Sequence, residues 1–212
     1  MKQPQQISTI IKKDTFPTAT YMSSPSESLA VSQQRAAIVI KRFGDSESFL
    51  KKVSPSTQTS FASHPNNAVI GDYPTLLDLK QAYGKNFAAI WLVPQIDNLT
   101  LFTGAKNITE QQHEELAKII AAEYGYLKVT ELLLFFHRFK AGHYGRFYGS
   151  FDPMVITCAL RDFIKERNIF IDQYEREQNN LQRELNKQGA ITREQWLEQK
   201  KQLSLENKNE QE

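Results

Sequence analysis

The feature that most constrains the fold is a long stretch of helical pattern near the end of the chain. Asp152 followed by Pro153 is a strong helix start, because an acidic N-cap precedes a proline at the first helical position. Gly189 supplies the matching stop signal. The stretch between them is apolar as far as Tyr174 and mostly polar afterwards. We therefore expect one long helix whose first half packs in a core and whose second half projects from it.

Helical periodicity also runs through the chain upstream of this helix, from Tyr73 onward. Thr75 and Thr130 can each cap a helix start, and Thr109 and Gln112 have the spacing of a capping box. Pro94 should kink or divide the helix that contains it. The last of these segments is apolar almost all round, which predicts the most buried helix. The expected helices cover residues 75–84, 85–104, 107–128 and 130–142.

The N-terminal third is more polar. Residues 1–26 are rich in Gln, Ser, Thr and Pro, a composition that favours a flexible arm. Residues 28–43 fit a helix, or a short strand over 36–43, because that part contains consecutive β-branched residues. Residues 54–74 carry three prolines and many turn formers, which predicts a linker. We therefore expect the helical core to begin near Tyr73.

Charge and cysteine content narrow the class of protein. A formal net charge of +2 over 212 residues provides no global field toward nucleic acid or membrane. The single cysteine, Cys158, suits a reducing compartment, and its apolar neighbours predict an inert, core-facing position. The longest apolar runs, such as 132–136, are far too short to span a bilayer, and the sequence shows no signal peptide. We expect a soluble cytoplasmic protein.

The segment between the two most apolar helices is rich in basic and aromatic residues, and it reads HRFKAGHYGRFYGSFDP from His137 to Pro153. It is locally positive, because no acidic residue occurs between His137 and Phe151. Basic side chains neutralise phosphates, and aromatic rings stack on exposed bases. We therefore predict a nucleic-acid or partner-binding site formed by Arg138, Lys140, His143, Tyr144, Arg146 and Tyr148.

A purely structural interpretation of this segment is also open. Gly142 would end one helix, and Gly145 and Gly149 would supply positive φ angles at tight corners. Rings would then fill the gap before the next helix: Phe139, Phe147, Tyr148 and Phe151. The two interpretations are compatible, because the rings can anchor the loop while the basic side chains point outward.

Catalysis and metal binding find little support. The histidines and Cys158 form no closely spaced pair of the kind that zinc sites use. The chain has no glycine-rich phosphate loop, and no nucleophile is accompanied by a legible base and orienting acid. We expect no enzymatic activity, no metal and no cofactor.

The C-terminal segment, residues 181–205, combines a leucine-spaced helix, a Gly-x-Ile-Thr turn and a helix start with paired lysines. It resembles the short C-terminal domain called SHOCT, although Gln195 replaces the usual acidic residue and Trp196 matches as an aromatic residue in place of the usual phenylalanine. The resemblance implies an appendage for oligomerisation or docking. The residues that match are Gly189, Ile191, Thr192, Glu194, Trp196, Lys200 and Lys201. The apolar residues expected to oligomerise in this hairpin are Leu181, Leu185, Ile191, Trp196 and Leu197.

A second resemblance covers residues 123–167 and extends upstream to about residue 73. The segment is similar to an uncharacterised family of helical proteins found on prophages and other mobile elements of gut bacteria. That family has no established activity, and its layout is similar to the N-terminal domains of phage helicase loaders. The matching residues are Tyr126, Leu127, Lys128, Phe136, Lys140, Gly142, Tyr144, Gly145, Tyr148, Asp152, Ile156, Glu166 and Arg167.

These observations predict an all-α protein built as a small helical bundle. We expect a flexible N-terminal arm with one possible short helix (1–72), a helical core (73–175), and a C-terminal hairpin with a frayed tail (176–212). The first functional hypothesis is a non-enzymatic accessory protein of a mobile element or phage. It would bind DNA or a replication protein through the basic-aromatic loop, as a helicase loader or adaptor does. The alternative is a protein-interaction module that oligomerises through the hairpin without binding nucleic acid, and a host-takeover or defence role would have the same signature.

Overall fold

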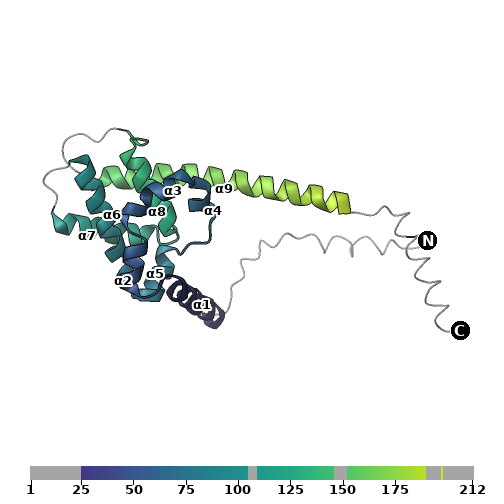
Figure 1. Cartoon of the computed structure of the whole chain (residues 1–212), viewed down its shortest axis with the longest axis horizontal. Helices are drawn as coiled ribbons and strands as arrows, with labels where there is room; N and C mark the ends of the chain where they lie inside the picture. Colours follow the sequence, from purple (N-terminus) through teal and green to yellow (C-terminus); the bar gives the residue numbers. More distant parts are fainter. Residues whose placement is uncertain (1–24, 105–108, 146–151, 190–196, 198–212) are drawn as a thin grey trace, which may run out of the picture.

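The computed structural model describes residues 25–104, 109–145, 152–189 and 197. Among these residues the regular secondary structure is helical, and an isolated bridge between Thr75 and Lys128 is the nearest approach to a strand. The predicted all-α class is confirmed. Figure 1 shows a helical body with one long helix projecting from it.

The helices follow one another in chain order with short connections. Those of the first half are α1 (Pro25–Phe43), α2 (Ser46–Lys52), a 3₁₀ turn (Pro55–Thr57), α3 (Gln58–Ser63), α4 (Pro65–Ile70) and α5 (Leu76–Tyr83). Those of the second half are α6 (Phe87–Thr103), α7 (Glu110–Glu123), α8 (Val129–Lys140) and α9 (Pro153–Gly189).

Capping side chains place several helix starts where the sequence predicts them. The Thr75 hydroxyl accepts a hydrogen bond from the Asp78 backbone N–H, and the Asp78 carboxylate accepts one from the Thr75 N–H. Thr109 and Gln112 form the same reciprocal pair at the start of α7. Asp152 Oδ1 accepts a backbone N–H of the first turn of α9 at 2.8 Å. These predictions are confirmed because capping depends on residues within one turn of each other.

The N-terminal third is more folded than the sequence predicts. α1 is a helix rather than a strand, and Val39 in its last part is buried. The expected linker over residues 54–74 instead contains a 3₁₀ turn, α3 and α4, with Ala68 fully buried. The prediction of a flexible arm is therefore wrong for residues 25–72. The helical body begins within α1 and not near Tyr73.

Hydrogen bonds from later parts of the chain hold these short helices in place. Trp91 Nε1 donates to the carbonyl oxygen of Val53 at 2.7 Å. The Thr130 hydroxyl donates to the carbonyl oxygen of Ala68, also at 2.7 Å. Lys128 Nζ donates to three carbonyl oxygens at the end of α4. Helices this short are unstable alone, so tertiary contacts decide that they form.

α8 runs through the middle of the body in Figure 1 and contacts α3, α4, α6 and α9. Every residue from Val129 to Phe136 is buried, which confirms α8 as the most buried helix predicted. The helix begins after Lys128, although the sequence predicts Thr130 as its cap. The difference arises because the Thr130 hydroxyl is occupied by the α4 backbone.

Two details differ from the sequence-based expectation. Pro94 lies inside α6 without dividing it, because Trp91 and Ile96 on either side of it are buried in the core and hold the helix. Cys158 is exposed rather than core-facing. The face of α9 that packs on the body contains Ile156 and Leu160, and Cys158 lies beside it.

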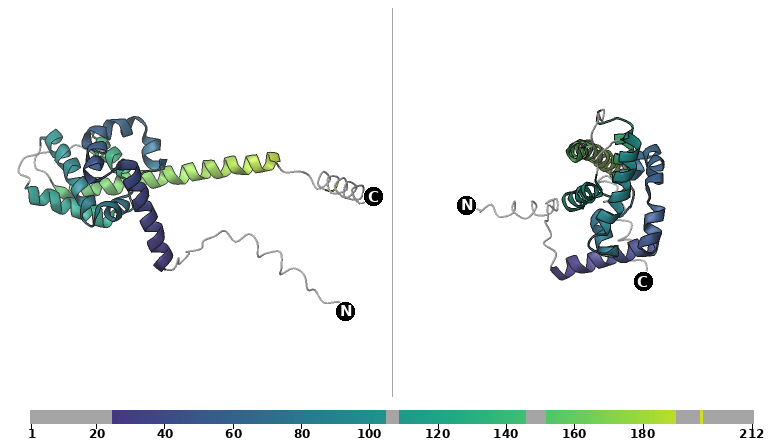
Figure 2. Two further views of the ribbon diagram at one scale, coloured as in Figure 1. Left: turned by 60° about the horizontal axis from the view of Figure 1, so that its bottom comes forward. Right: turned by 90° about the vertical axis from the view of Figure 1, so that its left-hand side faces the viewer.

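α9 is 37 residues long, which corresponds to about 55 Å. Its first half packs on the body, and Figures 1 and 2 both show its second half extending away. Every residue from Glu175 to Lys187 is exposed, which confirms the predicted projecting half. Within the described ranges, the helices include none that combines the length and apolar character needed to cross a membrane.

Candidate functional site

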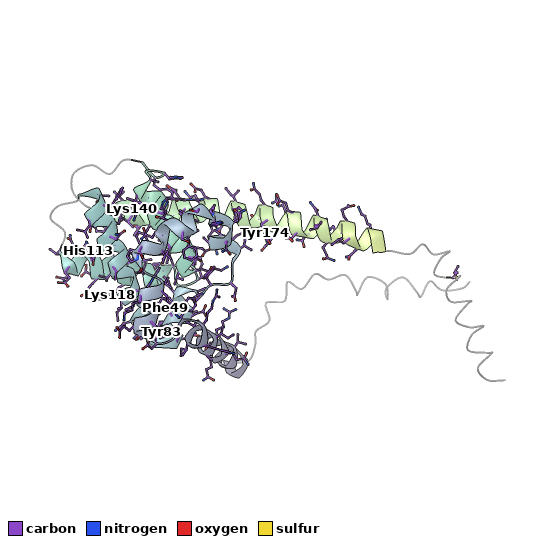
Figure 3. All side chains as sticks on the ribbon, in the orientation of Figure 1. Phe49, Tyr83, His113, Lys118, Lys140 and Tyr174 are labelled. Carbon is purple, nitrogen blue, oxygen red and sulfur yellow. The ribbon has the colours of Figure 1, made fainter. Side chains whose placement is uncertain are left out.

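The C-terminal end of α8 gathers the described basic residues of the predicted binding site. The helix stops after Lys140, and Gly142 follows with a φ of +81°, in the left-handed region that favours glycine. Gly145 repeats this conformation with a φ of +91°. The predicted helix stop and the first predicted tight corner are both confirmed. Figure 3 labels Lys140 at this end of the body.

Arg138 is engaged by α9. Its Nη1 atom donates to Glu166 Oε2 at 3.2 Å, and its guanidinium lies 5.9 Å from the centre of the Phe163 ring. The side chain is 27% exposed. An arginine that pairs with a carboxylate and lies over a ring is partly neutralised and held in one orientation. Arg138 therefore presents only part of its charge to a phosphate.

Lys140 is engaged by α6. Its ammonium group donates to Asn98 Oδ1 at 2.7 Å and lies 5.7 Å from the centre of the Phe102 ring. Burial lowers the pKa of Lys140, because the charged form is poorly solvated there. Arg138 and Lys140 of the predicted binding site thus both have partners inside the protein.

Tyr144 packs on the core while its neighbour His143 is exposed. The Tyr144 ring lies 5.7 Å from the ring of Phe135, measured between centroids. Burial, reinforced by the charge of Glu166, raises the pKa of Tyr144 to about 12, and the Arg138 guanidinium acts in the opposite direction. The ring anchors the turn, as the structural interpretation expects. The His143 side chain points into solvent, where it is accessible to a ligand.

The remaining two residues of the predicted binding site, Arg146 and Tyr148, lie outside the described residues. The described part of the loop therefore contains an aromatic anchor, two engaged cations and one exposed histidine. His137, one turn before the end of α8, has its pKa lowered by burial and by the positive charges of Lys140 and His143.

A buried ion pair beside this region was not predicted from the sequence. Arg167 Nε of α9 donates to Glu131 Oε1 of α8 at 2.6 Å, and the Glu131 side chain has no exposed surface. The other carboxylate oxygen accepts the Lys128 backbone N–H. The available signal was the lone acidic residue of α8, which stands directly before the apolar run 132–136, since a buried carboxylate requires a partner. Arg138 and Arg167 line the same cleft between α4, α8 and α9.

The predicted oligomerisation residues are only partly described. Leu181 is 56% exposed and Leu185 is 52% exposed on the projecting half of α9, and Leu197 is 43% exposed. Ile191 and Trp196 lie outside the described residues. The structure therefore presents the leucines of α9 to solvent, where a partner can reach them.

Catalytic or metal-binding groupings are sparse in the part of the chain that the structure describes. There, His, Cys, Asp and Glu side chains nowhere form a cluster of three placed to hold a metal ion. The exposed thiol of Cys158 accepts a hydrogen bond from an Nη atom of Arg161 at 3.2 Å.

Sequence comparison places both candidate regions in one segment. The profile of a family of unknown function (DUF6633) matches residues 107–209. That segment contains α7, α8 and α9, whereas α1 to α6 lie before it. No curated protein and no solved structure matches the chain. The expected likeness to an uncharacterised family is confirmed at this level, and the mobile-element origin and the SHOCT-like hairpin remain predictions.

Proposed function

We propose that the protein is a non-enzymatic adaptor that binds other proteins through the projecting half of α9. The observation that carries this proposal is the exposure of Leu181 and Leu185 on a helix that has left its own core. An isolated helical segment of this length is marginal in water, and apolar residues on it gain stability when a partner covers them.

Two sequence resemblances support this proposal. The likeness of residues 181–205 to SHOCT implies docking or oligomerisation, and the leucines of α9 belong to that segment. The likeness of residues 123–167 to proteins of prophages and mobile elements implies a phage or mobile-element setting. We therefore propose an accessory role for such an element in the cytoplasm. The projecting half of α9 would bind the partner and so connect it to the helical body.

Site-specific photocrosslinking tests the adaptor proposal. A benzophenone amino acid placed at position 181 in the full chain, expressed in its native host, should crosslink to a defined protein. The matched control is position 169, because Ile169 is 59% exposed on the outer face of the same helix. Crosslinking at 181 and not at 169 is the expected result. Equal yields at both positions, or none at either, would contradict the proposal.

A second candidate function is binding of DNA or a replication protein at the end of α8. The observation in its favour is that Arg138, Lys140 and His143 all come from the last turn of α8 and the residues after it, and Arg138 shares a cleft with Arg167. Although Arg138 and Lys140 have internal partners, a phosphate can accept two parallel hydrogen bonds from a guanidinium, as a carboxylate can. This candidate corresponds to the helicase-loader or adaptor hypothesis.

Fluorescence anisotropy tests the second candidate with labelled single- and double-stranded DNA at two salt concentrations. Salt-sensitive binding should be lost when Arg138, Lys140 and Arg146 are changed to alanine together. The control variant removes three exposed lysines elsewhere, Lys51, Lys118 and Lys187, and so has the same net charge. Equal loss in both variants would indicate unspecific attraction, and no binding by the wild type would exclude DNA as the ligand.

A further inference from the structure

One face of α9 carries a regular heptad pattern that continues from the body into the projecting half. Its positions alternate by three and four residues, the spacing at which one helix presents a stripe to another. We call this stripe the α9 seam. It consists of Ile164, Arg167, Ile171, Tyr174, Gln178, Leu181 and Leu185.

The first part of the seam is already occupied by the body. Ile164 and Ile171 pack against the core, and Arg167 pairs with Glu131. Tyr174 marks the point where the helix leaves the body, as Figure 3 shows. From there the same stripe continues uncovered through Leu181 and Leu185. The projecting half is therefore an extension of a surface that already packs against helices in this protein.

Charges on the projecting half are sorted about the seam. Glu175, Glu177 and Glu184 occupy the positions that flank it, the e and g positions of a heptad. Arg176 and Arg183 occupy the opposite face, and Lys187 forms an exposed ion pair with Glu184 at 2.9 Å. A helix lying along the seam would meet carboxylates on both sides of the apolar stripe, and flanking charges of this kind determine partner choice.

A second copy of the chain is a poor occupant. Parallel pairing in register could use only the free part of the seam, because the body already covers its first part. In antiparallel pairing, g positions face g positions, so Glu177 of each copy would face Glu184 of the other. Like charges in such pairs are destabilising. The free part of the seam, Tyr174–Leu185, spans only about 17 Å, which leaves little apolar contact to offset that repulsion.

We infer that the free part of the α9 seam binds an amphipathic helix of another protein whose apolar stripe is flanked by lysine or arginine. This inference rests on the proposed adaptor function and specifies the partner's chemistry. Leucines of the seam would supply the apolar contact, and the three glutamates would select the basic flanks. An acidic helix would meet the same repulsion as a second copy.

Two synthetic peptides of three heptads each probe this selection with the full chain. Both carry isoleucine at a and leucine at d, and they differ only in having lysine or glutamate at every e and g position. Fluorescence anisotropy should give a dissociation constant about tenfold lower for the lysine peptide, equivalent to about 1.4 kcal/mol. Changing Leu181 and Leu185 together to glutamine should abolish binding, and the control Ile169→Gln should leave it unchanged. Changing all three glutamates that flank the seam to lysine should reverse the preference.

Equal binding of the two peptides, or binding unaffected by the leucine changes, would overturn the inference. A chain that ends at Gly189 provides one more check. If it binds the lysine peptide more tightly than the full chain does, residues 190–212 are the occupant and the inference fails. The adaptor proposal fails separately, when position 181 crosslinks to nothing. If position 181 crosslinks to a protein but the lysine peptide is not preferred, the adaptor proposal stands and the inference of a basic partner helix is rejected.

Discussion

The two halves of α9 share one helix and one stripe of residues, yet they lie in different surroundings. In the first half, Phe163 is buried and Arg167 pairs with the buried carboxylate of Glu131. In the second half, Leu181 and Leu185 occupy the same face and are more than half exposed. The comparison teaches that side-chain pattern decides which face of a helix is available for packing. The presence of neighbouring helices decides whether that face contributes to stability.

The largest expected contrast is between one buried and one exposed apolar residue of α9. Phe163→Ala should destabilise the protein by about 3–5 kcal/mol, because it removes a buried ring and leaves a cavity. Leu181→Ala should change the free energy of unfolding by less than about 0.5 kcal/mol. Urea unfolding followed by circular dichroism measures both. Similar losses would mean that the projecting half is covered in solution.

The next contrast is between a buried and an exposed ion pair. Arg167→Met should destabilise the protein by about 3 kcal/mol, because the buried Glu131 carboxylate loses its countercharge. Adding Glu131→Gln should recover part of that loss, since it removes the buried charge. Lys187→Met, which breaks the exposed pair with Glu184, should have no measurable effect. Chemical denaturation of the wild type, the two single variants and the double variant measures these effects. A double variant less stable than Arg167→Met alone would contradict the prediction.

A smaller effect is expected at the packed end of α9. Asp152→Ala should cost about 1 kcal/mol, because the first turn loses the acceptor for a backbone N–H. Asp152→Asn keeps an acceptor at the N-cap and is the control. Measured by thermal unfolding, the melting temperature should be lower in the alanine variant and unchanged in the asparagine variant. Equal shifts in both variants would point to a role of the charge rather than of the cap.

The smallest effect concerns Tyr144, which lies beside the packed half of α9. Its ionisation does not influence the free energy of unfolding at neutral pH, where the phenol is neutral in both the folded and the unfolded protein. Its pKa is about 12 in the folded protein and 10.0 in its ordinary state. The neutral phenol is favoured by folding, so this stabilisation is complete below pH 10 and is lost as the pH rises toward 12. Tyr144→Phe should flatten that part of the pH dependence of the unfolding free energy. A slope unchanged in the variant would show that other groups cause it.

Much of the fold was predictable because its helix ends depend on local chemistry. The cap at Thr75, the capping box at Thr109 and the Asp152-Pro153 start were all recognisable in the sequence. The end of α8 at Gly142 was also predicted, since a left-handed residue there favours glycine. The exposed second half of α9 followed from its polar composition.

The candidate sites were less predictable, because partners distant in the chain determine them. The sequence shows that Arg138 and Lys140 are basic, but not that Glu166 and Asn98 engage them. It marks Tyr144 as aromatic without revealing that its ring packs on Phe135. A loop that reads as an open phosphate grip is therefore, in its described part, held closely to the body.

The sequence by itself determined the all-α class, the order and ends of most helices, and a long terminal helix with one polar half. Local hydrogen bonding and hydrophobic period carry that information within a few residues. Only the tertiary structure decided that residues 54–74 are helical, that Glu131 is buried with Arg167, and that Cys158 faces outward. These outcomes depend on groups 36 or more positions away, as for Arg167 and Glu131, or on which face of a helix meets the core. Only close packing in three dimensions brings those groups together.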